Sequence, residues 1–181
     1  MTTDIDLAQL ARDVDEKCRL TGHFTLRSGQ VTDEYFDKYL FESDPALVDR
    51  FRPHMVGLVP DDTDLLGGLE LGGVPLATLL SRMTGIPTLF VRKEAKTYGT
   101  CRLAEGGDPA GRRVLLVEDV ITNGGAVRNA ARALRDLGAT VTTVVCAIDR
   151  SDTGANTLNA DGLETRSVMT KALLDSVSGR S

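Results

Sequence analysis

The sequence predicts a single α/β domain with a central parallel sheet that is flanked by helices. From residue 64 onward, short apolar segments alternate with amphipathic helical segments, which is the pattern of a parallel sheet covered on both faces. The length of 181 residues suits one domain, which we expect to span 1–181. With 41% hydrophobic and 26% charged residues, the composition is that of an ordinary globular protein, so wholesale disorder is not expected.

The N-terminal third is expected to hold a helix, two short extended segments and a second helix. Apolar residues recur at helical spacing over residues 4–20. Short extended segments are expected at 23–27 and 35–37, with a turn between them. Asp44 and Pro45 form a helix start, because Asp caps a first turn and Pro fits into it. The inner face of that helix is expected to carry Ala46, Leu47, Phe51 and Met55.

The rest of the chain alternates between strand and helix, with one exception. Strands are predicted at 64–68, 87–91, 114–117, 140–148 and 163–169, and helices at 74–83, 126–138, 153–160 and 171–177. Residues 92–112 have no sustained apolar period and are rich in glycine and cations. A loop of this length inside a compact domain usually serves as a lid or a binding loop, so we expect a flexible loop at about 92–110.

Charge and composition exclude several classes of partner. The net charge of −5 disfavours nucleic acids and anionic membranes, which attract summed positive charge. Aromatic residues make up only 4% of the chain, too few for a platform on which single-stranded bases stack. The three cysteines have no close pair, which fits neither a disulfide framework nor a zinc site. The chain has neither a membrane-length apolar run nor a basic, apolar leader, so we expect a cytoplasmic protein.

The segment VLLVEDVITNGGA (114–126) carries the clearest chemical signal. A buried strand ends in Glu118 and Asp119, and a glycine-containing loop then opens a helix. Ligands of parallel sheets bind beyond the carboxyl ends of the strands, and N–H groups at a helix N-terminus attract phosphate. Two carboxylates would repel a bare phosphate but suit sugar hydroxyls beside it. The alternative is that the two acids merely cap the following helix.

This segment resembles the phosphoribosyl pyrophosphate (PRPP) signature of the type I phosphoribosyltransferases, which has four apolar residues, two acids, two apolar residues, Thr and small residues. The resemblance implies that family's fold, with a small N-terminal hood, mainly 1–44, in addition to the sheet. It also implies that Glu118 and Asp119 hold the ribose hydroxyls and that the following loop holds the 5′-phosphate. The PRPP-binding loop residues would be Val120, Ile121, Thr122, Asn123, Gly124, Gly125 and Ala126.

Further segments resemble the orotate phosphoribosyltransferases in the same order along nearly the whole chain. They are FTLRSG (24–29), EYFDKYLFE (34–42), FVRKEAKTYGTCRLAEG (90–106) and AIDR (147–150). The resemblance implies transfer of a phosphoribosyl group from PRPP to orotate, giving orotidine 5′-monophosphate and pyrophosphate in de novo pyrimidine (UMP) synthesis. It also implies Mg²⁺ as the cofactor, carried mainly by PRPP oxygens and ribose hydroxyls, and a homodimer in which the loop of one subunit reaches its neighbour's site.

The predicted lid holds four cations within eleven residues, at Arg92, Lys93, Lys96 and Arg102. Cations aimed at the leaving pyrophosphate would stabilise the charge that grows as the glycosidic bond breaks, and a closed lid would exclude water. A solvated basic loop is the alternative. The resemblance makes Lys96 the best catalytic candidate together with Asp119, and Tyr98 stands where many relatives have His.

The resemblance also assigns orotate-binding and pyrophosphate-binding residues. Arg27, Tyr35, Phe36, Thr122 and Arg150 would bind orotate, since an Arg fork matches a carboxylate and aromatic rings lie against a flat pyrimidine. The pyrophosphate loop would be Gly68, Leu69, Glu70, Leu71 and Gly72. Many relatives carry a Tyr-Lys pair in this loop, and its absence here predicts contacts mostly from the backbone.

Three other functions remain open at this point. A phosphoribosyltransferase for a purine or another base is disfavoured by the two cations, Arg27 and Arg150, which a neutral purine does not need. A PRPP-binding regulator without catalysis would explain the missing lysine in the 67–73 loop, but it has no use for a cationic lid. A receiver-like signalling domain would need acids at more than one strand end, and it gives no role to the TNGG turn.

Overall fold

The computed structural model describes residues 2–26, 29–94, 103–151 and 158–179, with side chains from Leu7 onward. A six-stranded sheet in the order β5-β4-β3-β6-β7-β8 forms its centre. Its strands are β3 (Leu65–Leu69), β4 (Thr88–Val91), β5 (Ala104–Glu105), β6 (Val114–Ile121), β7 (Thr143–Asp149) and β8 (Glu164–Thr170). All neighbouring pairs are parallel except β4 and β5. The predicted α/β fold is therefore confirmed, with one antiparallel edge strand.

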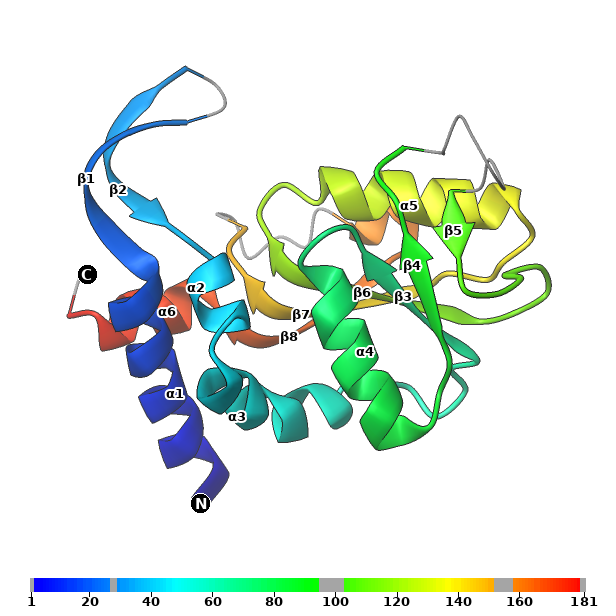
Figure 1. Ribbon diagram of the computed structural model, residues 1–181, viewed down its shortest axis with the longest axis horizontal. Helices are drawn as coiled ribbons and strands as arrows, with labels where there is room; N and C mark the ends of the chain where they lie inside the picture. The colour runs from blue at the N-terminus through cyan, green and yellow to red at the C-terminus, as the bar shows by residue number, and fades with distance from the viewer. Residues whose placement is uncertain (1, 27–28, 95–102, 152–157, 180–181) are drawn as a thin grey trace.

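Helices cover both faces of the sheet (Figure 1). Helix α5 (Gly125–Asp136) and the short turn η1 (Asn159–Asp161) lie on one face, where α5 buries Val127, Ala130, Ala131 and Leu134. Helix α4 (Gly73–Thr84) and helix α3 (Pro45–Val56) cover the other face. Because both faces are covered, the central strands β3, β6 and β7 are buried almost throughout.

The N-terminal part forms a separate hood at one end of the sheet. It consists of α1 (Thr2–Cys18), the antiparallel hairpin β1 (Arg19–Thr25) and β2 (Val31–Phe36), and α2 (Tyr39–Glu42). The hairpin projects away from the body, whereas α1 packs beside α6 (Lys171–Val177) (Figure 1). The hood therefore combines a projecting hairpin with helices that are anchored to the domain.

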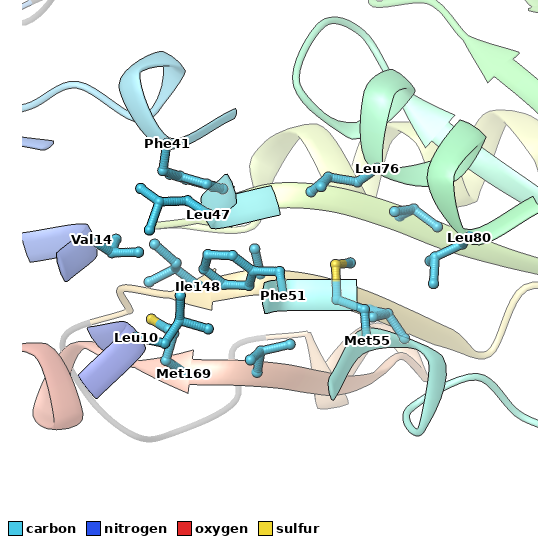
Figure 2. Close-up of a cluster of buried hydrophobic side chains, with 14 of the residues drawn as sticks. Leu10, Val14, Phe41, Leu47, Phe51, Met55, Leu76, Leu80, Ile148 and Met169 are labelled. Carbon is cyan, nitrogen blue, oxygen red and sulfur yellow. The ribbon is translucent and has the colours of Figure 1, made fainter. Parts of the chain in front are cut away.

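One apolar cluster fixes the hood to the sheet, and Figure 2 shows its larger side chains. Leu10 and Val14 of α1 and Phe41 of α2 meet Phe51 of α3 and Ile148 of β7, all fully buried. The rings of Phe41 and Phe51 lie 5.1 Å apart between centroids. Burying these side chains stabilises the contact, so α2 has a defined position relative to the strand ends.

Helix α3 confirms the predicted start, because the Asp44 carboxylate accepts hydrogen bonds from the N–H groups of Ala46 and Leu47. Ala46 itself is exposed, so its predicted place on the inner face was wrong.

The hairpin strands begin four residues earlier than predicted, at Arg19 and Val31. In β2, the three consecutive polar residues Thr32, Asp33 and Glu34 break the alternation that would mark a strand in the sequence.

Two further predictions were wrong near the carboxyl ends of the strands. Strand β6 continues to Ile121, because Val120 and Ile121 pair with Ile148 and Asp149 of β7. The two acids therefore lie within the strand, and the loop starts only at Thr122. The segment 92–112 is not all loop, since β5 pairs with the end of β4. Of the helix predicted at 153–160, residues 153–157 lie outside the described residues, and residues 159–161 form η1.

Candidate active site

The acid pair lies at the carboxyl end of β6, where the strand is still held by its neighbours. The backbone N–H of Asp119 donates to Oε1 of Glu118 at 3.1 Å, and the N–H of Val120 donates to Oδ1 of Asp119 at 2.6 Å. Glu118 is 7% exposed and Asp119 is fully buried. The two carboxyls are thus placed by a rigid strand and by hydrogen bonds from their own backbone.

Asp119 is the point where the hood and the loop after β3 meet the sheet. Nζ of Lys38 lies 2.6 Å from Oδ2 of Asp119. A Cβ added at Gly72 would lie 1.7 Å from Oδ2 of Asp119 and 2.8 Å from Oε1 of Glu42, so only glycine fits between the two acids. Three segments far apart in the sequence therefore close around a single carboxylate.

The three carboxyls of this cluster differ in protonation. Burial, together with the hydrogen bond to Asp119, raises the pKa of Glu42 and of Glu118 to about 9. For Asp119, burial acts upward, but hydrogen bonds from Glu42, Glu118 and Lys38 outweigh it, so the pKa of Asp119 is lowered. Burial likewise acts against the Lys38 ammonium, yet the contact with Asp119 leaves the pKa of Lys38 raised. The opposite directions of these shifts favour the negative charge on Asp119, next to the Lys38 ammonium.

The loop after β6 has the shape of an anion site. Thr122 and Asn123 are exposed, and Gly124 has a φ of 70° at the N-cap of α5. Oδ1 of Asn123 accepts a hydrogen bond from the N–H of Gly125 at 3.0 Å. Residues 120–127 and Glu118 line a cavity of about 50 Å³. A small cavity with a hydroxyl and a helix N-terminus at its wall suits a phosphate group.

The candidate orotate residues are brought only partly together. The Arg150 guanidinium lies 4.5 Å from the ring centroid of Phe36, and the Arg150 N–H donates to the carbonyl of Ile121 at 2.7 Å. Tyr35 is 43% exposed and packs against Phe24, with 5.5 Å between ring centroids. Neighbouring residues of a strand face opposite sides, so of the two aromatic residues only Phe36 joins Arg150. Arg27 lies outside the described residues.

The candidate pyrophosphate loop joins β3 to α4 and contacts the start of the lid. Gly68 and Leu69 belong to β3, Glu70 and Leu71 are exposed, and Gly72 caps α4. Oε2 of Glu70 accepts a hydrogen bond from the Lys93 N–H at 3.1 Å, and Oε1 lies 4.0 Å from Nη1 of Arg92. Nε of Arg92 is buried and has no hydrogen-bond partner within the described residues. A larger cavity of about 490 Å³ extends from this loop towards α5.

The strongest lid candidates, Lys96, Tyr98 and Arg102, lie outside the described residues. Sequence reasoning missed Lys38 and Glu42, although both lie in the segment EYFDKYLFE. The available signal was their spacing of four residues in one helical turn beside an apolar Phe41, which places two opposite charges on one side of that turn.

Within the described ranges, no three His, Cys, Asp or Glu side chains are grouped so that they could hold a metal ion. Among the helices described there, none has both the length and the apolar composition needed to cross a membrane.

Comparisons with known proteins agree with this geometry. The family model for the phosphoribosyl transferase domain matches residues 57–165, more than half of the chain. The chain is 67% identical over 175 residues to an orotate phosphoribosyltransferase of a Nocardioides species, covering 97% of this chain and 96% of that protein.

Solved structures give the same result. The crystal structure of orotate phosphoribosyltransferase from Aeropyrum pernix matches with a TM-score of 0.81 and 29% identity, over 94% of this chain and 98% of that one. The Mycobacterium tuberculosis enzyme, solved in complex with PRPP, matches with a TM-score of 0.77 and 33% identity, over 93% and 98% of the two chains. This chain therefore belongs to the orotate phosphoribosyltransferases of the type I phosphoribosyltransferase family.

Proposed function

We propose that this protein transfers the 5-phosphoribosyl group of PRPP to orotate, giving orotidine 5′-monophosphate and pyrophosphate, a step of de novo pyrimidine synthesis. The 67% identity to a protein named for this activity supports the pair of substrates. The structural observation that carries the proposal is the Glu118–Asp119 pair beside the cavity of the 122–126 loop. Acids next to a phosphate cradle suit a ligand that presents sugar hydroxyls next to a phosphate.

The reaction forms a bond between a ring nitrogen of orotate and C1′ of the ribose, while the bond from C1′ to the pyrophosphate oxygen breaks. Positive charge develops on the sugar and negative charge on the leaving group. Glu118 and Asp119 hold the ribose hydroxyls, and the N–H groups of residues 122–126 hold the 5′-phosphate. This arrangement fixes the ribose between the two reacting groups, which lowers the entropic part of the barrier.

The cations at the base of the lid act on the leaving group. Arg92 and Lys93 begin the lid next to the pyrophosphate loop, and the buried Nε of Arg92 has no hydrogen-bond partner within the described residues. Lys96 and Tyr98 remain predictions, Lys96 as the main cationic catalyst and Tyr98 as a hydrogen-bond donor. The pyrophosphate loop, Gly68–Gly72, supplies backbone contacts and brings a negative charge at Glu70.

Orotate binds where Arg150 and Phe36 meet. A guanidinium pairs with the orotate carboxylate through two parallel hydrogen bonds, and the Phe36 ring lies against the pyrimidine. Thr122 is exposed at the start of the phosphate loop and supplies a hydroxyl between the two substrates. Tyr35 and Arg27 remain further candidates from the hairpin.

Mg²⁺ is proposed to enter with PRPP. The fit of the described residues is limited, because the nearest acids are Glu118 and Asp119, and Asp119 is committed to Lys38. The ion would then be held by PRPP oxygens and ribose hydroxyls. When bound, it neutralises negative charge on the polyphosphate.

We also propose a homodimer in which the lid of each subunit reaches the site of its neighbour, and a cytoplasmic location. The resemblance of the lid segment supports shared sites. The dimer can be tested by mixing two strongly impaired variants, Lys96→Ala and Asp119→Asn. Shared sites predict that the mixture regains activity, because one of the two sites in a mixed dimer then carries neither substitution. Independent sites predict no recovery.

The activity is tested by following the absorbance of orotate in the presence of PRPP and Mg²⁺. We expect loss of orotate with release of one pyrophosphate per turnover. A second arm replaces orotate with hypoxanthine or adenine, which should not react. Binding of PRPP without consumption of any base would instead favour a regulator and overturn the proposal.

A further inference from the structure

The hood contributes two charged residues to the acid cluster of the strand ends. Lys38 directly precedes α2 and Glu42 closes it, so the four-residue spacing puts both side chains on the same side of the turn. Phe41, between them in sequence, is fully buried against Phe51. This anchor holds the turn in place, and the ammonium and the carboxyl reach Asp119 from a fixed support.

The Asp119 carboxylate is engaged by the protein at both oxygens. Oδ1 accepts the N–H of Val120, and Oδ2 lies 2.6 Å from Nζ of Lys38. Besides the Lys38 ammonium and the proton that a neutral Glu42 carries, no donor group of the described residues is directed at Oδ2 or at the facing Oε1 of Glu42. The charge at Oδ2 is therefore balanced by the Lys38 ammonium. A buried carboxylate without such a partner takes up a proton or distorts its surroundings.

Lys38 also distinguishes Asp119 from its two acidic neighbours. Glu42 and Glu118 lie against the same site, and three carboxyls share one close ammonium. Lys38 contacts Asp119 directly, so the negative charge is concentrated on that residue. Lys38 is 33% exposed while Asp119 is fully buried, so Lys38 lies between the carboxylate and solvent.

We propose that Lys38 is a positioning residue for the transfer reaction: its ammonium, in contact with Asp119, keeps that carboxylate ionised and fixed in direction. An ionised Asp119 has only acceptor oxygens, so it accepts a hydrogen bond from a ribose hydroxyl. A protonated Asp119 carries an O–H donor in place of one of these acceptor sites. Lys38 thus acts through Asp119 and not on the substrate itself. The proposal rests on the proposed function, because it assigns a role in that same site.

The test is a double-mutant cycle on the full-length protein with Lys38→Met, Asp119→Asn and the double variant. We expect Lys38→Met to lower kcat/KM for PRPP about 30-fold, as for residues that orient a catalytic group. In the Asp119→Asn background the same change should cost less than about 3-fold, because residues that act as one unit are not additive. Equal factors in both backgrounds would mean that Lys38 acts independently of Asp119, which overturns the proposal.

Two control variants separate positioning from simple stability. Lys38→Arg keeps a cation at the same place and should recover kcat/KM to within about 5-fold of the parent. Lys17→Met removes a hood ion pair, with Asp44, that does not touch the acid cluster, and should change kcat/KM less than about 2-fold. A loss with Lys17→Met equal to that with Lys38→Met would assign the effect to the hood as a whole and contradict the proposal.

A binding measurement covers the case in which Asp119→Asn has no measurable turnover. Calorimetric titration with PRPP and Mg²⁺ gives the same cycle in dissociation constants, and we expect the same lack of additivity. Thermal unfolding of each variant shows that it is folded at the assay temperature. If the parent protein neither binds PRPP nor turns over orotate, the proposed function fails. If the parent is active and the cycle is additive, only the role of Lys38 fails.

Discussion

The guanidinium of Arg150 lies 4.5 Å from the centre of the Phe36 ring, although one residue follows β7 and the other ends the hood hairpin. A cation over an aromatic face is attracted by the ring. The pair joins the hood to the sheet at the proposed orotate site, and a flat carboxylate-bearing ring fits beside it.

This pair predicts a specific loss of orotate affinity. Arg150→Gln should raise KM for orotate about 10- to 100-fold, the cost of losing a charge-assisted hydrogen bond to a carboxylate. KM for PRPP should change much less, since Arg150 does not belong to the phosphate loop. Initial-rate measurements with each substrate varied check both values. A larger effect on PRPP than on orotate would contradict the assignment, and Arg166→Gln on β8 is the matched control.

Gly72 predicts a steric effect at the acid cluster. Gly72→Ala places a methyl group within 2.3 Å of both Cγ and Oδ2 of Asp119, so the cluster must shift. We expect a loss of about 1–3 kcal/mol in the free energy of unfolding, as for overpacking elsewhere. Urea denaturation measures it. Gly57→Ala is the control, because its new Cβ would have its nearest contact at 3.6 Å, and it should be neutral. Equal stability of both variants would disprove the close approach.

The acid cluster predicts how stability depends on pH. The pKa of Glu42 and of Glu118 is raised to about 9 in the folded protein, from an ordinary value of 4.5 for a glutamate. The folded state then holds protons that the unfolded chain releases, so stability falls as pH rises from about 4.5 to about 9. Asp37, Lys38 and Asp119 are the other charged groups that influence Glu42. Glu118 also influences the buried thiol of Cys146, whose own pKa is raised chiefly by burial.

Replacing one of these acids should flatten that dependence. Glu42→Gln removes a carboxyl that must stay protonated, so it should raise Tm at pH 9 by at least about 2–4 °C relative to the parent and leave Tm unchanged near pH 4. Differential scanning calorimetry across this pH range provides the measurement. A variant whose Tm is lowered at pH 9 would mean that Glu42 is ionised in the folded protein.

Glu70 predicts an effect on product binding. Its carboxylate accepts the Lys93 N–H and lies near Arg92, at the loop where pyrophosphate is proposed to bind. Glu70→Gln removes a negative charge beside the leaving group, and we expect pyrophosphate to inhibit about 3- to 10-fold more strongly. Product-inhibition kinetics measure this. Asp61→Asn removes an equal charge from an exposed turn and should leave the inhibition constant unchanged. If both variants changed the inhibition constant equally, the effect would come from the net charge of the protein and not from the position of Glu70.

The regular elements were predictable wherever local pattern and tertiary packing agree. Helix α6 was predicted with its observed bounds, Lys171–Val177, and Asp44 marked the start of α3 because its cap uses neighbouring residues only. The last residues of β6 were not predictable, because two adjacent acids after an apolar run usually mark the end of a strand in a sequence. Their pairing with β7, distant in sequence, keeps them extended.

The chemistry of the site was predictable in type but not in arrangement. The sequence order EDVITNGG identified the acids and the phosphate loop, since these lie in one continuous segment. Lys38 and Glu42 could not be connected to Asp119, because their contact depends on the packing of Phe41 and on the space left at Gly72. Strand β5 has only two residues, too few for any periodic signal.

The hood has a consequence for folding during synthesis. Helix α1 leaves the ribosome early, but it packs beside α6, and Arg19 of the hairpin lies 3.7 Å from Asp175 of that late helix. The strands β7 and β8 against which the hood rests are also translated after the phosphate loop. Domains fold as units once their chain is available. The acid cluster therefore assembles late, so a nascent chain carries the complete PRPP signature before it can hold Asp119 in place.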